Sequence, residues 1–126
     1  MKIAALIARI LLGLIFVVFG LNGFLQFIPG SLPPGLADQF ASAMAQSHYV
    51  LAVSAVEVVG GVLMLSGFYI PLALVLLGPI IVNILFFHIF LFPHGAAPGI
   101  VVTILWFLVF FRYRQHFSAI LAHHAS

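Results

Sequence analysis

Six polar side chains interrupt long apolar stretches of this sequence, and their types suit hydrogen bonding and proton handling. They are Arg9, Asn22, Gln26, Glu57, Asn83 and His88. A carboxylate surrounded by hydrocarbon is costly, so Glu57 must be protonated, paired with a cation or facing a wet cavity. We therefore take Glu57, Asn83, His88, Asn22 and Gln26 as the candidate ligand-binding residues.

The depth of these side chains can be counted along their helices. Glu57 and Asn83 each lie about nine residues from the outer end of their stretch, which puts both roughly 13–14 Å deep. Asn22 and His88 lie nearer that end, and Gln26 lies one turn beyond Asn22 on the same face. The spacing predicts a polar set in the outer half of a helical bundle.

Each polar residue also has a purely structural interpretation. Arg9 and Glu57 differ in depth by about 7 Å, a distance that an extended arginine side chain nearly spans. An Arg9–Glu57 ion pair is therefore as well supported as a role of Glu57 in ligand or proton handling. For Asn22, Gln26 and Asn83, hydrogen bonds between helices are the simpler explanation. For His88, anchoring at the membrane interface is simpler than ligation.

Metal binding is not expected, although the chain has six histidines. No pair has the spacing of three or four residues that places two ligands on one helix face, and His123-His124 is a doublet near the end of the sequence. Convergence of His48, His88 and His94 at the outer surface is a weak signal. We therefore expect neither haem nor a metal ion.

The composition indicates which elements must position these side chains. Of 126 residues, 65% are hydrophobic and 5% are charged, so lipid must be the solvent for most of the chain. We expect an all-α fold, a membrane four-helix bundle forming one transmembrane domain, with spans at about 3–28, 49–68, 72–92 and 98–116. Four cations are too few for a nucleic-acid surface.

The connection between the first two spans is predicted to hold a short amphipathic helix at about 36–46. Leu36, Phe40 and Met44 recur every four residues and form an apolar stripe. Such a helix would lie along the membrane surface or cap the bundle; a partly ordered loop is the alternative. The fourth span is apolar only to Phe111, so its helix is expected to continue past Arg114.

The positive charges predict the orientation. Lys2 and Arg9 begin the first span and Arg112 and Arg114 end the fourth, so both termini should be cytoplasmic, in a cell inner membrane. The first apolar run is too long for a signal peptide and is expected to remain as a span. The spacing of Gly13 and Gly20, and the pair Gly60-Gly61, predict close helix packing.

Two segments resemble the DoxX family of small bacterial four-helix membrane proteins: RILLGLIFVVFGLNGF (Arg9 to Phe24) and VEVVGGVLMLSGFYIPLALVLLGPIIVNILFFH (Val56 to His88). The resemblance implies similarity to the small membrane subunit of a thiosulfate:quinone oxidoreductase, and it points to Arg9, Glu57 and Gly61. It brings no catalytic constellation. Many relatives have Lys where this chain has Asn22. The absence of cysteine argues against direct sulfur transfer by this chain.

Two functional hypotheses follow. The first is a redox-associated accessory subunit that binds a hydrophobic molecule such as a quinone through Glu57, Asn83 and His88. The second is a noncatalytic membrane scaffold that recruits membrane or soluble redox enzymes. Transport is less supported, because four short spans would need a homo-oligomer to form a pathway.

Overall fold

The computed structural model describes residues 2–26 and 32–122, and within these ranges the chain is helical and contains no strand. The elements, in order, are α1 (Lys2–Leu25), α2 (Leu36–Gln46), α3 (Tyr49–Ser66), α4 (Ile70–Phe90), the 3₁₀ helix η1 (Pro93–Gly95), α5 (Ala97–Tyr113) and the 3₁₀ helix η2 (Arg114–Leu121). The first-span residues predicted at 27–28 lie outside the described residues.

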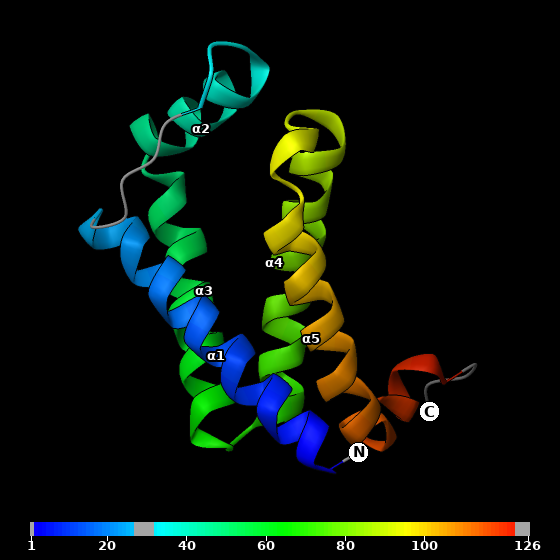
Figure 1. The fold of residues 1–126 in the computed structure, drawn as a ribbon. Helices are drawn as coiled ribbons and strands as arrows, with labels where there is room; N and C mark the ends of the chain where they lie inside the picture. Colours follow the sequence, from blue (N-terminus) through cyan, green and yellow to red (C-terminus); the bar gives the residue numbers. More distant parts are fainter. Residues whose placement is uncertain (1, 27–31, 123–126) are drawn as a thin grey trace.

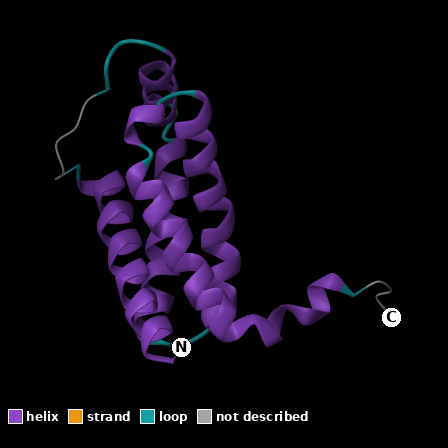
Figure 2. Ribbon diagram, turned by 45° about the vertical axis from the view of Figure 1, so that its right-hand side comes forward, coloured by secondary structure: helices purple, strands orange, loops and turns teal. Residues whose placement is uncertain are grey.

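Four of these helices are long and apolar enough to cross a membrane, as predicted: α1, α3, α4, and α5 with its extension to Ile120. They run alternately up and down as a bundle (Figures 1 and 2). Both ends of the chain lie at one end of the bundle, here called the terminal end, and α2 lies at the other, the α2 end (Figure 1). The predicted membrane four-helix bundle is confirmed.

Glycines bring α1 and α3 into backbone contact. A Cβ atom added to Gly61 would lie 2.9 Å from the Gly13 carbonyl oxygen, and one added to Gly20 would lie 3.0 Å from the Ser54 carbonyl oxygen. Such distances leave no room for a side chain, so the backbones meet directly, as in other small-residue helix crossings in membranes. The close packing predicted from these glycines is confirmed.

A tight turn joins α3 to α4 at the terminal end. Gly67 ends α3 with a positive φ of 81°, and its N–H donates to the Leu63 carbonyl oxygen over 3.1 Å. Glycine adopts this conformation without the strain that a Cβ atom would add. The Ser66 hydroxyl accepts a 3.1 Å hydrogen bond from the Phe68 N–H, and Pro71 lies in the first turn of α4. The turn therefore fixes α3 against α4 at this end only.

The apolar core fills the half of the bundle nearest the terminal end. Its largest fully buried side chains include Leu12 and Phe16 of α1, Met64 of α3 and Leu74 of α4. Helix α5 is tied to α4 by the Trp106 indole N–H, which donates to the Leu74 carbonyl oxygen over 3.0 Å. A buried indole N–H needs such a partner, because lipid offers none.

Helix α2 spans the range predicted for it and is a helix rather than a loop. Its Phe40 ring lies 5.7 Å from the Phe87 ring of α4, so α2 packs across the α2 end of the bundle. The fourth span continues as a helix past Arg114, as predicted, but its character changes: α5 ends at Tyr113, and the 3₁₀ helix η2 follows and turns away from the bundle (Figure 2). Half of its eight residues are polar, which explains why η2 does not continue along the apolar spans.

Candidate functional site

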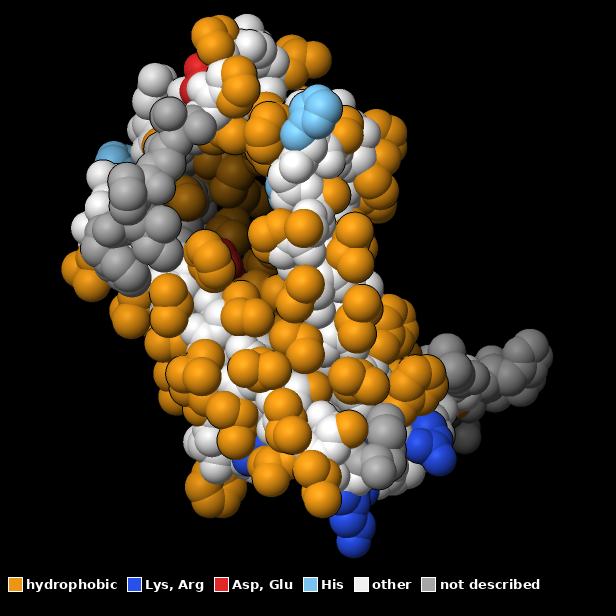
Figure 3. All heavy atoms as spheres, in the orientation of Figure 1, with side chains coloured by type: hydrophobic (Ala, Val, Ile, Leu, Met, Phe, Trp, Pro, Cys, Tyr) orange, Lys and Arg blue, Asp and Glu red, His pale blue; other side chains and the backbone are white. Residues whose placement is uncertain are grey.

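A cavity of about 980 Å³ occupies the half of the bundle nearest α2, and the core residue Phe16 lies at its border. Side chains from α1, α2, α3, α4 and α5 line it. Figure 3 shows the hollow on the side of the bundle, with an acidic side chain visible inside it and apolar side chains around it. The cavity is therefore an apolar chamber that opens on the face of the bundle seen there.

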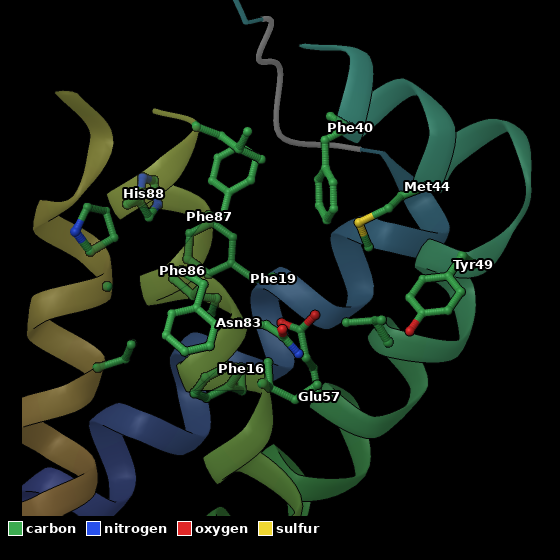
Figure 4. Close-up of a pocket in the computed structure, with 18 of the residues that line it drawn as sticks. Phe16, Phe19, Phe40, Met44, Tyr49, Glu57, Asn83, Phe86, Phe87 and His88 are labelled. Carbon is green, nitrogen blue, oxygen red and sulfur yellow. The ribbon is translucent and has the colours of Figure 1, made fainter. Parts of the chain in front are cut away.

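The polar groups of the cavity are few, and two of them come from the middle of their helices. Glu57 of α3 and Asn83 of α4 both point into the cavity (Figure 4). Counting residues along the two helices predicts that Glu57 and Asn83 lie at the same depth, and this agrees with the finding that both line the same cavity. A carboxyl and an amide together offer both donors and acceptors to one polar group of a ligand.

Aromatic rings form much of the cavity wall. Phe16 and Phe19 come from α1, and Phe86 and Phe87 come from α4 (Figure 4). Phe40 of α2 contributes from above, together with Met44. Flat aromatic faces and a flexible thioether are suited to holding a planar or chain-like apolar molecule without fixing its shape.

His88 lines the cavity wall, but part of its ring is committed to the fold. Its Nδ1 lies 3.0 Å from the Phe92 carbonyl oxygen, and its ring stands edge-on to Phe87 at 5.2 Å. This hydrogen bond requires a proton on Nδ1, which leaves Nε2 as the free position of a neutral ring. His88 therefore combines a structural role at the end of α4 with access to the cavity.

The other two predicted ligand residues are not brought to this cavity. Asn22, half-buried on α1, and Gln26, exposed just beyond the helix, are absent from its lining. Gln26 has a positive φ of 52°, and its N–H donates to the Asn22 carbonyl oxygen over 2.8 Å, so the chain leaves the helix there. The cavity thus unites Glu57, Asn83 and His88 from the predicted set.

Arg9 lies toward the other end of α3 from Glu57. Its Nη1 donates to the Met64 carbonyl oxygen over 2.5 Å, and a Cβ atom added to Gly67 would lie 3.0 Å from it. Met64 is seven residues beyond Glu57, about 10 Å along the helix. The structure therefore brings the guanidinium to a backbone carbonyl near the terminal end, and not to the Glu57 carboxylate.

Sequence reasoning did not assign Tyr49, Phe40 and Met44 to a site. The sequence indicates only that Phe40 and Met44 belong to an apolar stripe. The signal that could have placed them at the cavity is that such a stripe needs a surface to cover. Within residues 2–26 and 32–122, no three histidine, cysteine or acidic side chains lie close enough together to hold a metal ion. His123 and His124 lie outside the described residues.

Fold and cavity together define a class: a small helical membrane protein with four spans and an apolar chamber that carries a carboxyl group. The model of the DoxX family matches residues 4–89, about two thirds of the chain, from α1 almost to the end of α4. The chain belongs to the DoxX family, as its resemblance predicted. No curated protein and no solved structure matches it.

Proposed function

We propose that this protein binds a lipid-soluble molecule with a hydrogen-bonding head, most plausibly a quinone, in the cavity beside α2. The observation that carries the proposal is the pairing of Glu57 and Asn83 inside an otherwise largely apolar and aromatic chamber. Ligand sites of this kind combine apolar walls with a few convergent polar groups. A volume of about 980 Å³ is at the upper end for small-molecule sites, which leaves room for a head and part of a tail.

The chemistry of a quinone head fits the groups present. Quinone carbonyl oxygens accept hydrogen bonds, and the Asn83 amide donates them; Glu57 donates when neutral and accepts a proton when ionised. Phe19 and Phe86, which are exposed, supply aromatic faces against which a flat ring can stack. We expect the isoprenoid tail to leave through the side opening into lipid.

The role we propose is that of an accessory subunit in a redox assembly. The chain has no cysteine to carry thiol or iron–sulfur chemistry. Electrons would therefore be exchanged by a partner enzyme, while this subunit holds the lipid-soluble carrier. Under the positive-inside rule we expect the terminal end to face the cytoplasm, and the cavity would then lie in the outer half of an inner membrane.

Equilibrium titration tests the proposal. Purified protein in lipid nanodiscs is titrated with short-tailed ubiquinone and menaquinone analogues, comparing wild type with Glu57→Leu and Asn83→Leu. Loss of a buried hydrogen bond should weaken binding about tenfold in each variant. Glu57→Gln, which retains an N–H donor, should bind within a few-fold of wild type.

The matched control is Asp38→Asn, which removes the chain's other acidic group from α2 without touching the cavity lining. It should bind as wild type does. Absence of saturable binding by wild type, or equal weakening by Asp38→Asn, would refute the proposal and favour the scaffold hypothesis.

A further inference from the structure

A second, smaller pocket lies at the terminal end of the bundle, remote from the quinone cavity. Its volume is about 250 Å³, and it is lined by Lys2, Ala5, Leu6, Arg9, Gly67, Arg112 and Tyr113. Three of the four cations in the chain therefore meet in one place. They come from α1 and α5, which are far apart in the sequence.

The helix directions explain this convergence. Side chains of an α-helix tilt toward its N-terminus. Helix α1 begins at the terminal end, so Arg9 is directed back toward that end; α5 finishes there, so Arg112 is directed up into the bundle. Lys2 lies in the first turn of α1, whose backbone N–H groups have no acceptors within the helix. The Arg9 guanidinium thus points down toward the pocket, and the Arg112 guanidinium points up toward it.

No aspartate or glutamate side chain lines this pocket in the described part of the chain. The sequence has two acidic residues, Asp38 and Glu57, and both belong to the other half of the bundle. In the view of Figure 3, the lysine and arginine side chains gather at the terminal end. Cations held together at a membrane surface repel one another, so an external anion would stabilise this arrangement.

The geometry leaves donors available for such an anion. Arg9 uses one N–H to reach the Met64 carbonyl oxygen, and a guanidinium has five. The Arg112 guanidinium lies 5.7 Å from the centre of the Tyr113 ring, and both residues line the pocket. Arg9 and Arg112 are both half-buried, which strengthens their attraction to a negative charge.

We propose that this terminal pocket binds an anionic phosphate group, presented by a membrane phospholipid or free in solution. Arginine forks match the oxygens of a phosphate with paired hydrogen bonds. The volume accommodates a headgroup phosphate and not a whole lipid, whose chains would lie along α1 and α5. Basic pockets between spans at the cytoplasmic face commonly hold such headgroups.

Native mass spectrometry of the detergent-purified chain tests this proposal with three probes: phosphatidylglycerol, phosphatidylcholine and inorganic phosphate. Phosphatidylglycerol should bind saturably, and Arg112→Gln and Lys2→Gln should each weaken it, the former about tenfold. Arg112→Lys should recover part of the loss. Lys2 is exposed, so its variant tests the charge without disturbing the core.

The matched control is Arg114→Gln. Arg114 lies two residues further along and is exposed, its guanidinium donates to the Phe111 carbonyl oxygen, and it does not line the pocket. Binding should be retained in this variant. If inorganic phosphate also binds, depends on Arg112 and displaces the lipid, the phosphate site is confirmed, and its ligand can be free phosphate from solution.

Two results overturn the proposal. One is lipid binding that is unchanged in Arg112→Gln, together with no binding of inorganic phosphate. The other is a loss in Arg114→Gln equal to that in Arg112→Gln.

Discussion

Replacing Gly61 by alanine should separate α1 from α3 and destabilise the bundle. The added Cβ atom would lie 2.8 Å from Val17 Cγ2 and 2.9 Å from the Gly13 carbonyl oxygen. Ordinary contacts of this kind are about 3.5–4.0 Å, so the helices must move apart by several tenths of an ångström. Overpacking of this kind costs about 1–3 kcal/mol.

The matched control is Gly78→Ala on α4. There the added Cβ atom would meet its nearest neighbour, Trp106 Cζ2, at 3.7 Å, which is an ordinary contact. Both substitutions gain the same helix-propensity term of about 0.5–1 kcal/mol, so this term cancels when the two variants are compared. The free energy of unfolding should therefore be about 1–3 kcal/mol lower for Gly61→Ala than for Gly78→Ala.

The assay is equilibrium unfolding in mixed micelles of increasing sodium dodecyl sulfate content, followed by circular dichroism. The two variants should unfold at clearly different detergent fractions, with Gly78→Ala at or above wild type. Equal stability of Gly61→Ala and Gly78→Ala would show that the α1–α3 crossing is not held by backbone contact.

Two further substitutions test other contacts. Trp106→Phe removes the indole N–H that donates to the Leu74 carbonyl oxygen. In the same unfolding assay, the free energy of unfolding should fall by about 0.5–1.5 kcal/mol. Unchanged stability would mean that this hydrogen bond does not hold α5 against α4. Phe40→Ala removes the ring that faces Phe87 and should weaken quinone-analogue binding several-fold in the nanodisc titration, whereas Leu36→Ala, outside the cavity lining, should not. Equal binding by Phe40→Ala and Leu36→Ala would show that the Phe40 ring of α2 does not contribute to the site.

Hydropathy and turn residues were sufficient to predict the spans, because a helix in lipid must satisfy its own backbone and be long enough to cross. The counting of depth also placed Glu57 and Asn83 at one level, and both line the cavity. Depth along a helix depends only on the 1.5 Å rise, which no packing detail changes.

Rotation about each helix axis could not be predicted in the same way. In lipid the outer face of a helix is as apolar as its buried face, so the hydrophobic pattern does not reveal which side faces the neighbours. This is why Asn22 was grouped with the cavity residues, although it does not line the cavity. It also explains why the aromatic wall around Phe16 and Phe86 was not recognised.

Arg9 illustrates a second limit, which concerns side-chain direction. The vertical gap to Glu57 was counted between backbone positions. Side chains tilt toward the start of their own helix, and α1 and α3 are antiparallel, so the two side chains point away from each other. The guanidinium accordingly reaches Met64 instead.

The side opening of the cavity determines how an occupant would arrive. A molecule that enters through the flank of a bundle comes from the surrounding bilayer and diffuses in two dimensions (Figure 3). Its occupancy then follows its mole fraction among the lipids, and the aqueous concentration matters only through partitioning. Dissociation constants measured at different lipid contents should therefore agree only when the ligand concentration is expressed as mole per cent of the lipids.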